Sequence, residues 1–153
     1  MTSLDLTLRL LLAAGLGAVI GIEREYRRKA AGLRTNTLIA LGSALFTIVS
    51  IKLGAGGGTP DRIAAQVVTG IGFLGGGAIL RSGHSVQGMT TAATIFVNAA
   101  IGMAAGAGQS ALAATATVIT LVVLALVPPI EEYFERRTGF VSGHVEDTGP
   151  RDE

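Results

Sequence analysis

The sequence contains no cysteine. This absence excludes disulfide bridges, thiolate metal sites and cysteine nucleophiles, because all three need a Cys side chain. No Ser-His-Asp set, phosphate-binding loop or paired carboxylates with catalytic spacing takes their place. We therefore predict a protein that is not an enzyme.

Charged residues are also scarce. They make up 15% of the chain, against about 25% in an average soluble domain. Hydrophobic residues make up 49%, so an ordinary soluble enzyme is excluded. The net charge of +1 gives no overall electrostatic reason to bind nucleic acid, and we predict no such partner.

Long uncharged runs are what the sequence has instead. A helix needs roughly 20 apolar residues to cross a bilayer. Residues 35–51 and 63–80 are uncharged for 17 and 18 positions, which suits one span each, and residues 82–130 are uncharged for 49 positions, which suits two spans and a turn at 106–110. At the start of the chain, Asp5 and Arg9 lie four apart and can pair on one helix face. The predicted spans are residues 4–22, 35–53, 60–80, 90–105 and 110–127. The predicted fold is an all-α membrane protein, a bundle of about five transmembrane helices occupying residues 1–130.

The distribution of Lys and Arg predicts the orientation of this bundle, because these residues accumulate in short cytoplasmic loops. One side of the five-helix arrangement carries nine of the 12 basic residues and the other side carries three, Arg9, Lys52 and Arg62. The nine are Arg24, Arg27, Arg28, Lys29, Arg34, Arg81, Arg136, Arg137 and Arg151. We therefore expect the N-terminus outside and the C-terminus in the cytoplasm.

The end of the chain changes character at Pro128 and Pro129, which we expect to end the last span. In residues 131–137 all side chains but Tyr133 and Phe134 are charged, and these two fall at helical spacing from Ile130, which predicts a short helix at the inner membrane interface. Residues 138–153 are polar and lack a hydrophobic period, so we expect a disordered cytoplasmic tail.

Glycine is abundant, with 22 residues. Three Gly-xxx-Gly pairs allow helices to approach closely in lipid, either within one subunit or at a subunit interface: Gly17/Gly21, Gly72/Gly76 and Gly102/Gly106. From the small size of the chain and these Gly-rich faces we expect a homodimer. Gly75, Gly76 and Gly77 are consecutive and are a candidate helix break or pore element. Asn98, the amide inside the fourth span, either bonds across helices or faces a pore.

The predicted topology brings the two loops with the most polar chemistry to the cytoplasmic face, where the second and fourth spans begin. The candidate functional residues of this inner face are Glu23, Arg24, Glu25, Arg34, Thr35, Asn36, Arg81, Thr90 and Thr91. The threonines and Asn36 are candidate helix caps. The bilayer itself is an expected partner, because basic residues near the membrane surface attract anionic lipid.

Two interpretations of Glu23 and Glu25 remain open. They either neutralise Arg34, Arg81 and the helix starts as a structural charge cluster, or they bind a cation such as Mg²⁺, which proteins hold through one or two carboxylates. Residues 23–34 contain five basic and two acidic side chains, a local charge of +3 that repels a divalent cation. We predict no cofactor. Binding of Mg²⁺ by Glu23 or Glu25 is the one alternative to this prediction.

Four stretches of the chain resemble the MgtC/SapB family of bacterial inner-membrane proteins. They occur in the family's order between about residues 15 and 106, with Phe96 where Trp is expected. The stretches are residues 21–25 (GIERE), 31–38 (AGLRTNTL), 70–79 (GIGFLGGGAI) and 88–94 (GMTTAAT) followed by 99–102 (AAIG). The sequence ends after the fifth predicted span, so the resemblance implies a short member without the soluble, ACT-like C-terminal domain of the magnesium-starvation virulence proteins.

The resemblance implies a multi-pass protein of the bacterial inner membrane that is linked to growth at low magnesium, acid stress and virulence. It also implies a function as a regulator of a membrane ATPase or transporter. The alternative is a small ion channel or carrier associated with Mg²⁺ transport, with a path along Gly75–Gly77, Asn98 and the inner loops.

Overall fold

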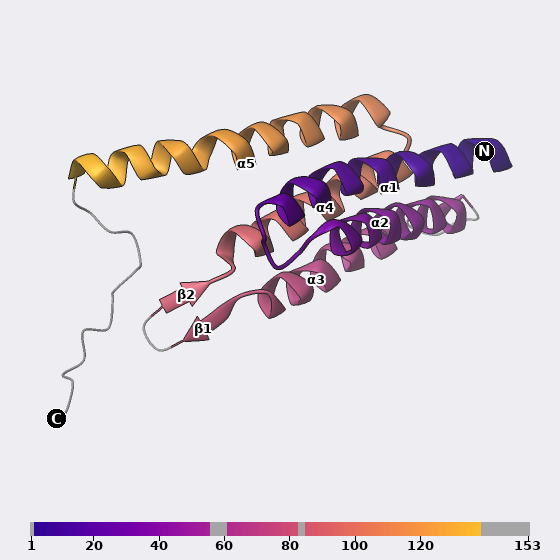
Figure 1. The fold of residues 1–153 in the computed structure, drawn as a ribbon. Helices are drawn as coiled ribbons and strands as arrows, with labels where there is room; N and C mark the ends of the chain where they lie inside the picture. The colour runs from indigo at the N-terminus through magenta and orange to yellow at the C-terminus, as the bar shows by residue number, and fades with distance from the viewer. Residues whose placement is uncertain (1, 56–60, 83–84, 139–153) are drawn as a thin grey trace.

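The computed structural model describes residues 2–55, 61–82 and 85–138 of the chain. These residues form a bundle of five helices with one small hairpin, which confirms the predicted all-α fold (Figure 1). The helices are α1 Ser3–Tyr26, α2 Leu33–Gly54, α3 Asp61–Gly77, α4 Met89–Gly106 and α5 Ser110–Thr138. The hairpin consists of β1 Leu80–Ser82 and β2 Ser85–Gln87.

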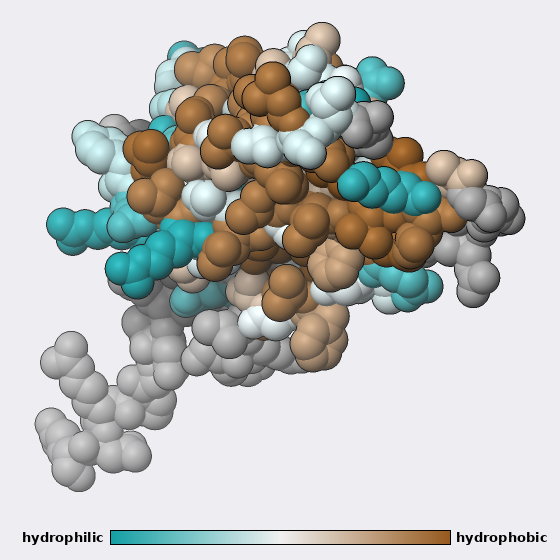
Figure 2. Space-filling model, turned by 90° about the vertical axis from the view of Figure 1, so that its right-hand side faces the viewer, coloured by the Kyte–Doolittle hydropathy of each residue, from teal (hydrophilic) through white to brown (hydrophobic). Residues whose placement is uncertain are grey.

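Four of the helices have the length and composition needed to cross a membrane: α1, α2, α4 and α5 up to Glu131. The apolar part of α3, Ile63–Gly77, is shorter. At about 1.5 Å per residue it measures roughly 22 Å, against about 30 Å for the hydrocarbon core of a bilayer. Apolar side chains cover much of the surface that Figure 2 presents, as expected for a protein whose solvent is lipid.

Helices α1, α2 and α4 pack on one another and form the centre of the bundle. Helix α5 packs on α1 and α4, whereas α3 packs on α2 and α4 (Figure 1). Both flanking helices therefore have a broad face that no other described part of the chain covers, and many of the exposed apolar side chains belong to them.

Glycines explain how closely the central helices approach. A Cβ atom on Gly102 would collide with the carbonyl oxygen of Ala40, and one on Gly106 would lie 2.5 Å from the carbonyl oxygen of Ala44. On α1, a Cβ atom on Gly17 would lie 2.7 Å from the Cβ of Ala40. In lipid, where burial of apolar surface gives helices no reason to associate, contacts of this kind hold a bundle together. Two of the three Gly-xxx-Gly pairs are thus used for packing within one chain.

The hairpin between α3 and α4 is a feature that the sequence analysis did not predict. We expected the third span to reach Leu80, but α3 ends at Gly77, and β1 and β2 pair antiparallel with Arg81 opposite Val86. The low helix propensity of the three consecutive glycines agrees with this early end. Gly88 returns the chain into α4 with a φ of 89°, a left-handed conformation that favours glycine.

Helix α5 also differs from its prediction. The helix continues through Pro128 and Pro129 to Thr138, so residues 131–137 belong to the same helix as the last span and do not form a separate one. Within it, Arg137 stacks on the ring of Tyr133 at 5.2 Å. The predicted tail, apart from Thr138, lies outside the described residues.

The ends of the helices agree with the predicted topology. The α1–α2 loop, the hairpin and the C-terminal end of α5 share one end of the bundle, and the N-terminus lies at the other (Figure 1). At that other end Arg9 Nε contacts Asp5 Oδ1 at 3.1 Å, the ion pair that their spacing predicts, and Arg9 Nη1 donates to the Gly106 carbonyl at 3.0 Å. Which end faces the cytoplasm stays a prediction from the distribution of basic residues.

Candidate functional site

The predicted inner-face residues gather at the hairpin end of the bundle, and two amides form their buried centre. Asn36 on α2 and Asn98 on α4 are both fully buried. Asn98 Nδ2 donates to the Asn36 carbonyl at 2.7 Å and to Asn36 Oδ1 at 3.1 Å. Asn98 therefore forms the hydrogen bond across helices that was one of its two interpretations.

Asn36 also forms hydrogen bonds to the loop that precedes α2. Its Nδ2 donates to the carbonyl oxygens of Ala31 at 2.7 Å and Gly32 at 3.0 Å. A single amide therefore bonds to both the loop and α4. The amide oxygen of Asn98 is buried and has no hydrogen-bond partner among the described residues.

Glu23 and Arg24 form the charged part of the site. The side chain of Arg24 is only 2% exposed, and its Nε donates to Glu23 Oε2 at 2.8 Å. Arg27 pairs with the other oxygen, Oε1, as an ion pair that is not aligned as a hydrogen bond. We expected Arg34 to pair with Glu23, but Arg34 is exposed, and the partners of Glu23 are Arg24 of α1 and Arg27, the C-cap residue of the same helix.

Arg27 also joins the cluster to α5. Pro129 has no N–H group, so it leaves the carbonyl oxygen of Ala125 without its usual helical donor. Arg27 Nη2 lies 3.4 Å from that oxygen and donates to it. The same guanidinium thus pairs with Glu23 and replaces a donor that a proline removed from another helix.

Glu25 has a different task from Glu23. Its Oε2 accepts a hydrogen bond from the backbone N–H of Leu33 at 2.8 Å, at the first residue of α2. A carboxylate is favourable there because the N–H groups at a helix start carry partial positive charge. Glu25 therefore neutralises a helix start, as the structural interpretation proposed.

The residues that we expected to cap α2 and α4 do not do so. The N-cap positions are Gly32 and Gly88, and neither helix has a side-chain cap hydrogen bond. Thr35 is exposed in the first turn of α2, and Thr90 is exposed at the start of α4, whereas Thr91 is 6% exposed. The backbone of Arg81 lies in β1, at the same end of the bundle (Figure 1).

The three consecutive glycines end α3 and do not interrupt it. Gly75 is buried against α4, where a Cβ atom would lie 3.6 Å from the Ala92 carbonyl oxygen. A Cβ atom on Gly76 or Gly77 would meet no neighbour within 4 Å. Within the described residues no group of three or more His, Asp or Glu side chains could hold a metal ion.

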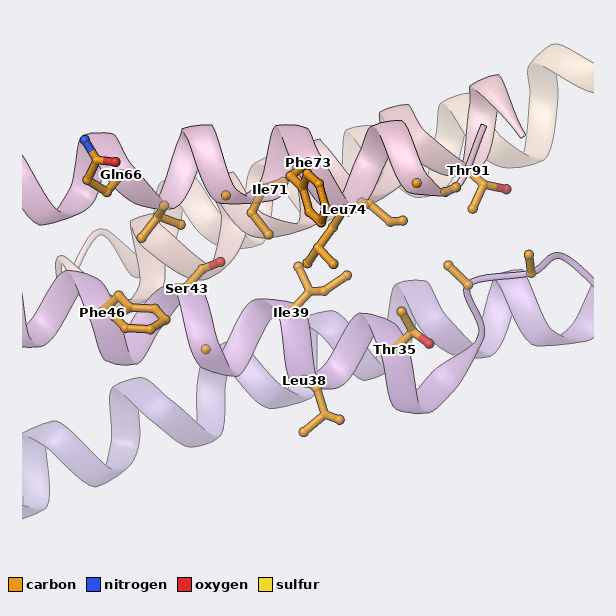
Figure 3. Close-up of a pocket in the computed structure, with 18 of the residues that line it drawn as sticks. Thr35, Leu38, Ile39, Ser43, Phe46, Gln66, Ile71, Phe73, Leu74 and Thr91 are labelled. Atoms are coloured by element: carbon orange, nitrogen blue, oxygen red, sulfur yellow. The ribbon is translucent and has the colours of Figure 1, made fainter. Parts of the chain in front are cut away.

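A groove between α2 and α3 is the part of the structure that the sequence analysis missed. Its volume is about 990 Å³, and Ile39, Ile71 and Leu74 line its middle (Figure 3). Thr35 and Thr91 lie near one end of it, and Phe46 and Gln66 lie near the other (Figure 3). The lining positions of α2 repeat with helical spacing, but the sequence alone does not say whether such a face is covered by another helix.

A second omission is a series of small hydroxyl residues on the buried face of α2. Ser43 and Thr47 are 3% and 6% exposed, and Thr47 Oγ1 donates to the Ser43 carbonyl at 2.8 Å. They follow Asn36 and Ala40 at intervals of three or four residues, a helical period that could have identified this face. Together with Thr94 and Asn98 of α4, they make the interface between the central helices polar.

The fold and this site define a multi-pass helical membrane protein with a polar centre at one end of the bundle. The sequence profile of the MgtC family matches residues 10–133, and the chain belongs to that family. It is 49% identical to "Protein MgtC" of Brucella abortus over 120 residues, which cover 78% of this chain and 50% of that protein. It is 51% identical to "Protein MgtC" of Salmonella typhimurium over 114 residues, 74% of this chain and 48% of that protein.

An uncharacterised protein of Synechocystis is 45% identical over 130 residues, 85% of this chain and 55% of that protein. The chain therefore spans about half the length of the curated relatives that it matches. No solved structure matches this chain.

Proposed function

We propose that this chain is a regulator of the bacterial inner membrane that acts by binding another membrane protein, without catalysis of its own. The proposed context is that of the MgtC family resemblance: magnesium limitation, acid stress or virulence. The proposed partner is a membrane ATPase or a transporter.

The observation that supports this proposal is the uncovered face of α3. Gly72 and Gly76 form the third Gly-xxx-Gly pair, and a Cβ atom on either would meet nothing within 4 Å. The other two Gly-xxx-Gly pairs pack against α2 of the same chain, whereas the pair on α3 contacts no described helix. Phe73, between the two glycines, is 84% exposed.

The length of α3 supports the same surface. A hydrophobic helix shorter than the bilayer is accommodated by local thinning or by association with other helices. In lipid, small residues on an open helix face let a second helix approach closely. A second copy of this chain can occupy the same face, and we propose a homodimer as one form of the protein.

The test is growth at low magnesium of cells in which this protein is required. Gly72→Leu with Gly76→Leu should remove the growth advantage by blocking the approach of a partner helix, while the amount of protein in the membrane stays normal. Gly15→Leu is the matched control, since Gly15 is also open but lies on α1. Full function of the double variant would contradict the proposal.

A small ion channel or carrier is the second candidate. The buried polar side chains on α2 and α4, above all the Asn98 oxygen without a partner, favour it. With Gly75–Gly77 they are the residues from which a path would be built. Robust Mg²⁺ flux through the purified protein in liposomes would favour this candidate over the regulator, and absence of flux is the result that we expect.

A further inference from the structure

We propose that the groove between α2 and α3 binds one anionic phospholipid, with an acyl chain along the groove and the phosphate at the end formed by the α1–α2 loop. Gly72 and Gly76 do not line this groove, although Phe73 between them does, so the groove adjoins the Gly72–Gly76 face. Binding of a lipid in the groove does not require a protein on that face.

The groove has the length of one leaflet. Its lining on α2 extends from Thr35 to Phe46, which is about 17 Å at 1.5 Å per residue. The hydrocarbon core is about 30 Å thick, so the groove spans roughly half of it. A transmembrane helix would need a groove along the whole core, whereas an acyl chain occupies one leaflet.

The lining is suited to an acyl chain. Apart from a few hydroxyl and amide groups, the side chains are aliphatic or aromatic, and Leu38, Phe46 and Leu74 are each more than half exposed. Gly42 and Gly70 contribute open space on the two helices, since a Cβ atom on either would meet no neighbour within 4 Å. An acyl chain in this space would contact protein on both sides.

The charge at one end specifies an anionic headgroup. Ala30 and Thr35 line the groove, and they are the direct neighbours in sequence of Lys29 and Arg34, both exposed. Arg34 lies one helical turn before Leu38, a lining residue, and thus on the same side of α2.

The nearby acids do not neutralise these two cations. Glu23 pairs with Arg24 and Arg27, and Glu25 accepts from the start of α2. Within the described residues, no carboxylate forms an ion pair with Lys29 or Arg34. The hydroxyl groups of Thr35 and Thr91, at the same end of the groove, can donate hydrogen bonds to a phosphate (Figure 3).

Native mass spectrometry of the purified full chain in a neutral detergent tests this site, with phosphatidylglycerol and phosphatidylcholine of identical acyl chains as probes. We expect one phosphatidylglycerol to be retained in preference to phosphatidylcholine. Lys29→Gln with Arg34→Gln should weaken phosphatidylglycerol binding roughly 30-fold, because each basic residue near the surface contributes about a factor of five. Lys52→Gln, at the other end of α2, is the charge control and should change little.

Gly70→Leu tests the groove itself. The leucine enters open space and should displace both lipids, whereas Gly15→Leu should displace neither. A melting temperature near that of the unaltered protein shows that Gly70→Leu folds. Equal retention of the two lipids, equal losses in Lys52→Gln and the double variant, or normal binding by folded Gly70→Leu would each overturn the proposal. Loss of a dimer without loss of lipid in Gly70→Leu would overturn it too, since a second copy would then occupy the groove.

Discussion

Arg24 is the residue on which the charged end of the bundle depends. A guanidinium that is 2% exposed is costly to bury unless an opposite charge accompanies it, and Glu23 provides that charge at 2.8 Å. Another nitrogen of the guanidinium, Nη1, is buried and has no hydrogen-bond partner in the described part of the chain, so the burial of Arg24 is not fully compensated by Glu23. The position of Glu23 next to Arg24 therefore matters more for stability than the overall charge of the loop.

Removing the negative charge should expose this dependence. Glu23→Gln is expected to destabilise the protein by on the order of 3 kcal/mol, because it leaves the buried Arg24 without its counter-charge. Glu23→Gln with Arg24→Met should recover part of that loss, since two neutral side chains cost less than one lone buried charge. Thermal unfolding in detergent measures both variants, with and without millimolar Mg²⁺.

The alternative function of Glu23 makes the opposite forecast. If Glu23 binds a cation, Glu23→Gln should melt normally yet lose function, the double variant should recover nothing, and Mg²⁺ should raise the melting temperature of the unaltered protein alone. A normal melting temperature for Glu23→Gln would refute the structural interpretation.

At the scale of the helices, identical sequence motifs have different surroundings. Gly102 and Gly72 each begin a Gly-xxx-Gly pair on an apolar helix, and nothing in the local sequence tells them apart. Gly102 lies against the backbone of Ala40, whereas Gly72 faces open space. Whether a Gly-xxx-Gly pair contacts another helix of the same chain depends on which helices are neighbours in the bundle. The local sequence does not determine those neighbours.

Leucine substitution should separate the two environments. Gly102→Leu is expected to cost at least about 1–3 kcal/mol, because α2 and α4 must move apart to accept the side chain. Gly72→Leu should be neutral or slightly stabilising, because leucine has a higher helix propensity than glycine, by about 0.8 kcal/mol. Thermal unfolding of the two variants in the same detergent makes the comparison, and equal destabilisation would show that the α3 face is packed within the monomer.

Individual elements were predictable to different degrees. The spans of α1, α2, α4 and α5 follow from uncharged runs of the right length, because lipid penalises unpaired charge wherever the chain crosses it. The hairpin and the early end of α3 did not follow, since residues 63–80 are as uncharged as a true span. The continuation of α5 through Pro129 was not predicted. The carbonyl oxygen of Ala125, which Pro129 leaves without a helical donor, accepts from Arg27, and these two residues are 98 positions apart in the sequence.

At the scale of the whole molecule, the predicted topology placed the candidate functional residues at one end of the bundle but did not predict which of them pair. Alternating helix directions were enough to predict that residues 21–36 meet the start of α4. The partner of Glu25, the backbone N–H of Leu33, depends on the geometry of the α1–α2 loop, in which Arg28 adopts a φ of 54°. A residue other than glycine rarely adopts this conformation, and without a glycine at this position the sequence did not predict it.

The central claim is that the uncovered face of α3 is where this protein meets another membrane protein. The chain has no cysteine, so one introduced at Gly76 carries a photoreactive crosslinker at a single site. In native membranes we predict a specific adduct from position 76, either at twice the mass of the chain or with a second membrane protein, and little from the equally open Gly15. Equal yields from positions 76 and 15, or no protein adduct from position 76, would contradict the account.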